Sequence, residues 1–148
     1  MSTTPENNAN AVIPLARADL EAVIQKTPFA LLLGAKLEEY GDGVANLSVA
    51  LRPDLTMHMG FAHGAVVGFL ADSACAWAAA STVGNVVTSE YKLNLIAPGI
   101  GEQLRAEGRV LKAAGRNLVC MANVYAVNQG KSTLGRVNNQ WAMSILDL

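Results

Sequence analysis

One carboxylate stands inside an otherwise apolar stretch, GFAHGAVVGFLADSACAWAAAS at residues 60–81. The stretch is typical of a buried helix, and Asp72 is its one charged residue. An unpaired charge in such surroundings costs several kcal/mol. We therefore expect Asp72 either to be satisfied by loop amides or to serve as a general base or nucleophile.

A second chemical element lies at the start of the same helix. Gly64 and Ala65 fall in its first turn, where backbone N–H groups lack intrahelical partners. Such an amide can stabilise the oxyanion that forms when a carbonyl is attacked, by about 3 kcal/mol per donor. A carboxylate and an oxyanion donor are the minimum for hydrolysing an activated ester. His63 either caps or packs against the helix or takes part in catalysis, but it would project nearly opposite Asp72, so the two cannot form a dyad on one helix.

Other catalytic chemistries find less support in the sequence. The serines lack a GxSxG setting, and neither a phosphate-binding glycine motif nor HExxH occurs. Cys75 lies one turn from Asp72 without an evident base, which favours a core role. Cys75 and Cys120 both lie in apolar segments without a CxxC, so we expect free thiols in a reducing compartment and no metal site.

The bulk composition indicates one domain, residues 15–148, after a disordered tail at residues 1–14. Because 51% of the residues are hydrophobic and only 5% are aromatic, the core must consist mainly of Ala, Val and Leu. Eleven basic residues against 12 acidic ones give no footprint for nucleic acid or an anionic membrane. The start of the chain lacks the pattern of a secretory signal, and the apolar run from Gly64 to Ala80 is short for a membrane span and contains Asp72. A cytoplasmic protein is expected.

The elements that must position these residues can be placed from hydrophobic periodicity. Leu20, Val23 and Ile24 form one stripe of a short N-terminal helix that ends at Thr27-Pro28. Residues 35–51 read as two strands around a tight turn at residues 41–43.

After the apolar helix, the period changes to that of strands. Residues 86–98 alternate, which predicts one half-buried strand with two faces: Thr88, Glu90, Lys92 and Asn94 on the polar face, and Val87, Tyr91, Leu93 and Leu95 on the apolar one. Residues 101–113, 116–128 and 132–146 are three more extended stretches. The sequence thus predicts an α+β fold, with a curved antiparallel sheet of five to six strands wrapped around a long central helix.

The central helix is apolar nearly all round, so every side of it must be covered. The cover could come from sheet curvature, from the N-terminal helix or from another chain, which favours an oligomer. A stripe of small residues beside the carboxylate, at Gly68, Ala76 and Ala79, would let a backbone or an extended ligand approach closely.

The stretch HMGFAHGAVVGFLADSACAWAAAS, followed by VVTSEYKLNLIAPGIGEQLRAEGRVLKAAGRNLVC, resembles the PaaI-like branch of the hotdog-fold acyl-CoA thioesterases. The resemblance covers roughly residues 45–145. It rests on an HGG-like start of the helix, an acid eight residues after the motif glycine, a strand leading to a Pro turn, and a later Gly-Arg. It implies a hotdog fold, edge-to-edge dimers with a continuous sheet, and a tetramer made of two such dimers.

The resemblance also implies roles for single residues. Asp72 matches the general base or nucleophile, Gly64 the glycine whose N–H polarises the thioester carbonyl, and Thr88 a hydroxyl that helps to place the attacking water. It implies a site between two chains, with the glycine from one chain and the acid and hydroxyl from the other. No metal and no cofactor are expected.

The sequence departs from the family pattern at three points. The motif reads His63-Gly64-Ala65, a mild change because Ala65 keeps its N–H. Met57 occupies a position where many members carry Asn or Gln, so either His58 substitutes for that amide or the activity is low. By strict alternation Thr88 falls on the polar strand face, and only twist or a bulge would aim it at the site.

An apolar or aryl acyl group of medium length is expected from the side chains available near the helix and loop, namely Met57, Met59, Phe61 and Phe69. CoA phosphates would need cations, for which Lys92, Arg109, Lys112 and Arg116 are candidates, although each also fits an ordinary solvated charge.

Two other functions compete with hydrolysis of acyl-CoA. A non-catalytic protein that binds acyl-CoA or another small ligand on the same fold is favoured if Met57 marks a decayed site. A hydratase or dehydratase would need a His paired with an acid, and the nearest His in sequence faces away from Asp72.

Overall fold

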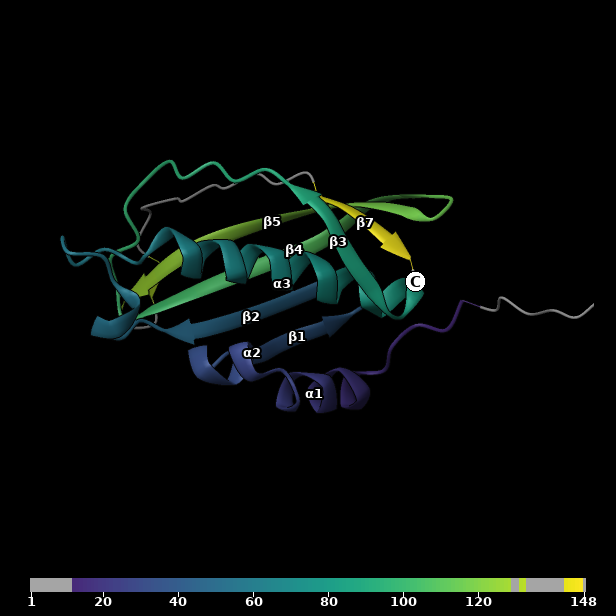
Figure 1. Ribbon diagram of the computed structural model, residues 1–148, viewed down its shortest axis with the longest axis horizontal. Coiled ribbons are helices and arrows are strands. Elements are labelled where there is room, and N and C mark those ends of the chain that lie inside the picture. The colour runs from purple at the N-terminus through teal and green to yellow at the C-terminus, as the bar shows by residue number, and fades with distance from the viewer. Residues whose placement is uncertain (1–11, 129–130, 133–142, 148) are drawn as a thin grey trace, which may run out of the picture.

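The computed structural model describes residues 12–128, 131–132 and 143–147. A long helix, α3 (Gly64–Val83), lies across one face of an antiparallel sheet, and two short helices lie beside the sheet edge formed by β1 (Figure 1). The strands are β1 (Lys36–Gly41), β2 (Val44–Ala50), β3 (Val86–Tyr91), β4 (Gln103–Ala114), β5 (Asn117–Asn128), β6 (Lys131–Ser132) and β7 (Met143–Asp147).

The order of the strands is β1-β2-β4-β5-β7-β3, and the two-residue β6 pairs with β5. The predicted fold class, an antiparallel sheet around a long central helix, is confirmed. In the described part of the chain, six strands form the continuous path, and β6 adds a seventh. Residues 1–11 of the predicted tail and residues 133–142 of the last predicted strand lie outside the described residues.

The N-terminal segment forms two helices where the sequence predicted one. Helix α1 (Arg17–Gln25) buries Leu20 and Ile24 as expected, but Val23 is 45% exposed. The helix ends before Pro28, as predicted, yet Pro28 itself begins α2 (Pro28–Leu33). Proline is tolerated at the first position of a helix because the N–H that it lacks would have no intrahelical partner there.

The turn between β1 and β2 is the predicted one. Asp42 and Gly43 both adopt positive φ values, 51° and 78°, as a tight two-residue hairpin turn requires. Farther back in β1, the pairing register shifts between Leu37 and Glu39. Arg17 of α1 donates to the carbonyls of Leu37 and Glu38 at this bulge, at 3.4 and 3.3 Å. In this way α1 satisfies backbone carbonyls of the edge strand β1, which the bulge in β1 displaces from the ladder.

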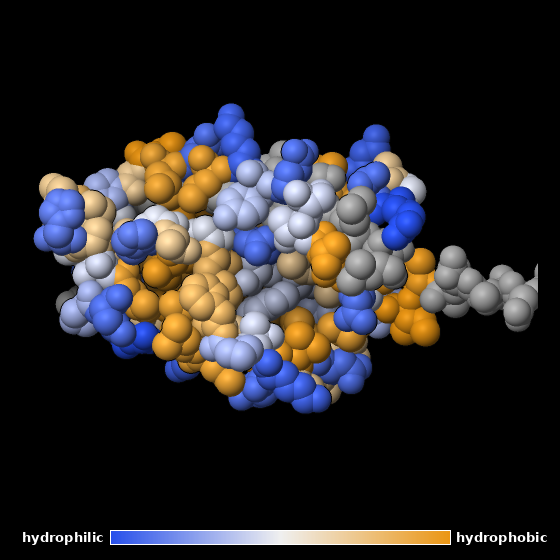
Figure 2. Space-filling model, in the orientation of Figure 1, coloured by the Kyte–Doolittle hydropathy of each residue, from blue (hydrophilic) through white to orange (hydrophobic). Residues whose placement is uncertain are grey.

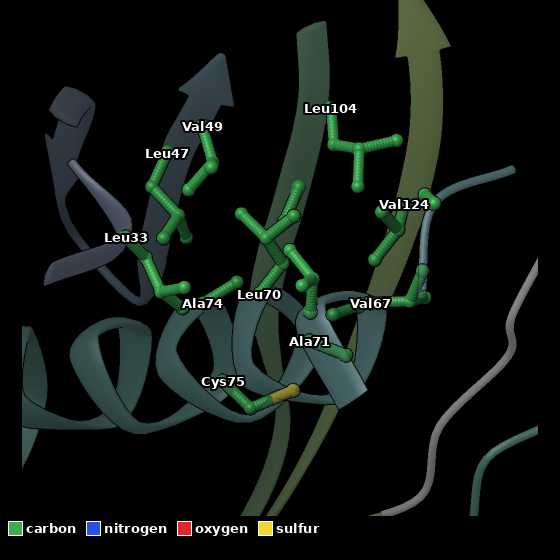
Figure 3. Close-up of a cluster of buried hydrophobic side chains, with 14 of the residues drawn as sticks. Leu33, Leu47, Val49, Val67, Leu70, Ala71, Ala74, Cys75, Leu104 and Val124 are labelled. Atoms are coloured by element: carbon green, nitrogen blue, oxygen red, sulfur yellow. The ribbon is translucent and has the colours of Figure 1, made fainter. Parts of the chain in front are cut away.

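The core lies between α3 and the sheet. Leu70, Ala71 and Ala74 of α3 face Leu47 of β2 and Leu104 of β4 in Figure 3. Most of these side chains are small or aliphatic, as the scarcity of aromatic residues predicts. α3 is the one helix among the described residues that is long and apolar enough to cross a membrane, and most of it is buried here as the core helix.

A glycine of β4 sets how closely α3 approaches the sheet. A Cβ on Gly108 would lie 2.3 Å from the carbonyl oxygen of Ala74, a backbone atom in the middle of α3. No side chain larger than hydrogen fits there unless the helix moves.

The other sides of α3 are covered partly by the chain itself. Phe69 and Trp77 pack toward the cluster formed by Leu20, Ile24 and Ala30 of the N-terminal helices. Sheet curvature and the N-terminal segment thus both contribute cover. Apolar surface nevertheless remains over the first half of α3 and over the loop after β3 (Figure 2).

Replacing Gly108 with alanine should lower the free energy of unfolding by about 3 kcal/mol, because the new Cβ forces α3 and β4 apart. The matched control is Gly68→Ala in α3. There the new Cβ meets only ordinary contacts, 3.8 Å from the Tyr91 hydroxyl, and alanine gains about 1 kcal/mol of helix propensity. Urea unfolding measures both variants, and equal destabilisation would contradict the close approach at Gly108.

Candidate active site

The carboxylate of Asp72 has a defined partner. Asp72 is half-buried on α3, and Thr88 Oγ1 of β3 donates to its Oδ1 at 2.7 Å. Within the described part of the chain, this hydroxyl, and not a loop amide, satisfies the carboxylate. Among the described residues, no donor occupies the second Asp72 oxygen, which leaves it able to accept a proton.

At the start of β3, over residues 86–88, the face that meets α3 is the opposite of the predicted one. Val86 and Thr88 point toward the helix, whereas Val87 is 43% exposed. Over these three residues the alternation was assigned to the wrong face, because Val86 and Val87 are both apolar and the contact with Asp72 decides between them, whereas Tyr91, Leu93 and Leu95 of the predicted apolar face do meet α3. Beyond Thr88 the pairing with β7 shifts register, and Tyr91 returns to the helix side.

β3 and the loop after it run antiparallel along one face of α3. Thr88 meets Asp72, Tyr91 and Leu93 meet Gly68, and Leu95 meets Gly64, one contact for each turn of the helix. The small residue at position 68 therefore admits the chain's own side chains, where the sequence suggested a backbone or an extended ligand. The predicted strand over residues 86–98 ends at Tyr91, where its described pairing with β7 ends.

The start of α3 presents one unsatisfied amide. His63 caps the helix, since its Nδ1 accepts from Ala65 N at 3.1 Å, and its carbonyl accepts from Val66 N and Val67 N. The Gly64 N–H meets no acceptor in the described part of the chain. Of the two candidate oxyanion donors, Gly64 is thus the open one, and Ala65 is occupied. Of the two roles weighed for His63, the structure shows the cap.

A cavity of about 320 Å³ opens beside this amide. Met57 and Phe61 of the preceding loop line it together with Gly64, as the sequence suggested, and Leu95 and Ile96 close it from the loop after β3. Leu95 and Ile96 were not predicted as site residues, because residues 86–98 were predicted to form a strand. The apolar run Leu95-Ile96-Ala97 directly before Pro98 was the available signal.

Several predicted residues lie elsewhere. His58 is exposed in the turn from Met57 to Gly60, outside the cavity lining. Phe69 stacks edge-to-face on Phe29 of α2, with ring centroids 5.3 Å apart, and so belongs to the N-terminal cluster. Lys92 is exposed directly after β3. Arg116 lies in the β4–β5 hairpin, at the end of the sheet away from the start of α3 (Figure 1).

The two cysteines are core residues. Burial raises the pKa of Cys120 to about 11 and strongly raises the pKa of Cys75, where the neighbouring Cys120 and Asp72 add smaller effects. Both thiols stay protonated near neutral pH, which argues against a cysteine nucleophile. No three His, Cys, Asp or Glu side chains gather as a metal site in the described ranges.

The amide and the carboxylate lie too far apart to act on one carbonyl within one chain. Gly64 and Asp72 are eight residues apart on one continuous helix. At 1.5 Å per residue this is about 12 Å along the axis. A site that uses both groups must take them from two copies of α3.

The family model described as "Thioesterase superfamily" matches residues 59–133. The match runs from the turn before α3 through the end of β6 and so includes Gly64, Asp72 and Thr88. No curated protein matches the chain significantly.

Solved structures agree with the family model. A thioesterase family protein from Silicibacter pomeroyi is 26% identical, with a TM-score of 0.76 over 86% of this chain and 93% of that one. The phenylacetic acid degradation protein PaaI from Thermus thermophilus is 25% identical, with a TM-score of 0.69 over 82% and 100%. The PaaI protein from the phenylacetic acid degradation operon of E. coli has 20% identity and a TM-score of 0.74 over 88% and 91%, a likeness of fold alone. The chain therefore belongs to the thioesterase superfamily, and its fold is that of the PaaI-like hotdog proteins.

Proposed function

We propose that the protein hydrolyses acyl-CoA thioesters with a medium-chain or aryl acyl group to the free acid and CoA. Membership of the thioesterase superfamily supports thioester hydrolysis in general. The apolar cavity beside Gly64, with Met57 and Phe61 in its wall, supports an apolar acyl group.

One observation carries the proposal. An open N–H and a hydroxyl-bound carboxylate, the two groups that ester hydrolysis needs, are held about 12 Å apart on a single helix. Neither group has another evident task in the monomer. Joining Gly64 of one subunit to Asp72 and Thr88 of another would complete a site.

The order of the strands indicates how two subunits would meet. β1 and β3 are the two ends of the path, and Arg17 of α1 occupies carbonyls of β1. Among the described strands, β3 ends the path on the other side and carries Thr88 beside Asp72, and we place the contact with a second copy there. A dimer joined there would place the carboxylate next to its interface. The exposed apolar side chains of α2, namely Phe29, Leu31 and Leu32, support a second contact and hence a homotetramer, a dimer of dimers.

In the proposed reaction, the thioester carbonyl oxygen accepts a hydrogen bond from the Gly64 N–H. Asp72 takes a proton from water while the water oxygen bonds to the carbonyl carbon, and the amide stabilises the resulting oxyanion. The C–S bond then breaks, and the CoA sulfur leaves with the proton held by Asp72. Direct attack by Asp72 followed by hydrolysis of the anhydride uses the same groups. Thr88 orients the carboxylate in either route.

The proposed function also includes the binding partners, the cellular location and the residues that contact the CoA phosphates. The substrate is acyl-CoA, with no role for nucleic acid or a membrane, which agrees with a formal net charge of −1. Cytoplasmic location agrees with the two unpaired, buried cysteines. Lys92 and Arg116 remain the candidates for phosphate contacts, and both are exposed outside the cavity lining.

Met57 supports a second candidate, acyl-CoA binding without turnover. Its thioether lines the cavity beside Gly64, where an amide side chain would hydrogen-bond the carbonyl or the attacking group. A protein with that substitution could hold the acyl group and release it unchanged. Hydrolysis measurements separate the two functions.

Release of free CoA thiol from a panel of straight-chain and aryl acyl-CoA esters should be catalysed by the wild type. Asp72→Asn should lower kcat at least about a hundredfold with little effect on KM, because it removes the basic oxygen and keeps the shape. A variant that retains more than about a tenth of wild-type kcat would reject Asp72 as base or nucleophile. Tight binding without thiol release by the wild type would favour the binding protein.

Thr88→Val should lower kcat about tenfold, less than the change at Asp72, because the carboxylate loses its orienting donor but keeps its basicity. Thr88→Ser restores the hydroxyl and should recover most of the rate, with KM nearly constant in both variants. Equal loss in the Val and Ser variants would show that Thr88 acts through packing and not through its hydrogen bond to Asp72.

Two inactive variants should complement each other if the site is shared. Gly64→Pro deletes the open N–H at a position that accepts proline, because His63 before it is already extended, with φ −65° and ψ 136°. The proline Cβ meets only the tip of the half-exposed Leu95. Asp72→Ala removes the carboxylate. When the two variants are refolded together in equal amounts, random pairing makes about half of the dimers mixed. Each mixed dimer has one whole site, so activity should return to roughly a quarter of wild type.

Cross-linking and light scattering show whether folded mixed dimers have formed in the mixture. A mixture that contains folded mixed dimers and shows no recovery would contradict the shared site. A stable monomer at micromolar concentration would contradict it as well, because the two groups could then never meet.

A further inference from the structure

Leu95 occupies a special place in the cavity wall. Its Cδ1 lies 3.1 Å from the point where a Cβ on Gly64 would stand, so it covers the backbone beside the open amide. The side chain is nevertheless 55% exposed in the monomer. Its apolar tip is thus held at the mouth of the cavity rather than within the core.

Both flanks of Leu95 are fixed in place. On one side, Tyr91 and Leu93 rest on Gly68, one helix turn along from Gly64. On the other side, the Gly99 carbonyl accepts from Ala62 N at 2.9 Å, and a Cβ on Gly99 would lie 3.1 Å from the Ala62 Cβ. A segment pinned at both ends holds its central side chain at a set distance from the amide.

We infer that Leu95 determines specificity for the acyl group, by selecting against groups branched at the carbon next to the thioester carbonyl. The inference rests on the proposed function, because the carbonyl oxygen must sit at the Gly64 N–H. The carbon bonded to that carbonyl then lies next to Leu95. A straight chain presents hydrogens to it, and a methyl branch at the same carbon meets the leucine tip.

Other residues of the cavity are less suited to this selection. Val67 is buried at 4% exposure in the floor of the cavity, and Met57 is an unbranched, flexible side chain that yields to a ligand. Leu95 is branched, and its tip lies in contact range of the position that a Gly64 side chain would occupy. Leu95 is therefore the residue that restricts the shape of the acyl group next to the thioester carbonyl.

Leu95→Ala tests the inference, with Leu111→Ala as the matched control. Leu111 is 51% exposed on β4 and lies outside the cavity lining, so the two variants lose the same atoms at similar exposure. The measured quantity is the ratio of kcat/KM for isobutyryl-CoA to kcat/KM for butyryl-CoA. Leu95→Ala should raise this ratio about tenfold, in the range that one methyl group is worth in an apolar pocket. Leu111→Ala should leave it unchanged.

A double-mutant cycle gives a second measurement at the same contact. Gly64→Ala keeps the N–H but places a Cβ against Leu95, so it should lower the ratio further. Adding Leu95→Ala should restore it, which makes the two effects non-additive. Additive effects, or an unchanged ratio in Leu95→Ala, would overturn the inference, as would an equal change in the Leu111→Ala control.

Failure of the proposed function is distinguishable from failure of this inference. If the wild type releases no thiol from any ester, the proposal that it hydrolyses acyl-CoA is wrong. The role of Leu95 is then tested by measuring binding in place of turnover. The probes are then the ketone analogues of butyryl-CoA and isobutyryl-CoA, in which a methylene group replaces the thioester sulfur. If Leu95→Ala strengthens binding of the branched analogue about tenfold relative to binding of the straight analogue, the role of Leu95 is supported. An unshifted ratio overturns it.

Discussion

The close approach of α3 to β4 is the constraint on which the rest of the structure depends. Gly108 leaves no room for a side chain against the Ala74 carbonyl, and alanines at positions 71, 74 and 78 give the helix a thin, flat contact face. Asp72 precedes Ala74 by two residues, which is about 200° around the helix. Seating Ala74 on the sheet therefore turns Asp72 away from it, toward β3. The same packing that buries the helix thus delivers the carboxylate to Thr88.

One rigid helix holds both the carboxylate and the open amide, and this links chemistry to assembly. Side chains on loops could move together, but two groups on a continuous helix keep their separation unless the helix breaks. The Ala-rich core and the Gly108 contact hold α3 straight against the sheet. Bringing Gly64 and Asp72 to one carbonyl then requires a second helix, so a dimer is part of the proposed mechanism and not merely a source of stability.

Local signals were sufficient for much of the fold. The hairpin at residues 41–43, the end of α1 before Pro28 and the whole of α3 follow from turn residues and periodicity. The inward face of β3 could not be predicted, because it depends on the non-local contact between Thr88 and Asp72 and on a register shift set by β7. The pairing of Gly64 with Leu95 was missed for a similar reason, since only the packed chain shows that the loop runs antiparallel to the helix.

The small residues of α3 serve two different neighbours. On the sheet side, alanines admit the backbone of β4, and on the opposite side Gly64 and Gly68 admit Leu95, Leu93 and Tyr91 from the same chain. Those glycines are filled by the protein, so they do not themselves form a channel for an extended ligand. The open space lies instead at the start of the helix, between the Met57 turn and the loop after β3. An acyl group that binds there must lie against the Gly64 backbone, and the shape of that opening, more than its polarity, decides which groups can reach the amide.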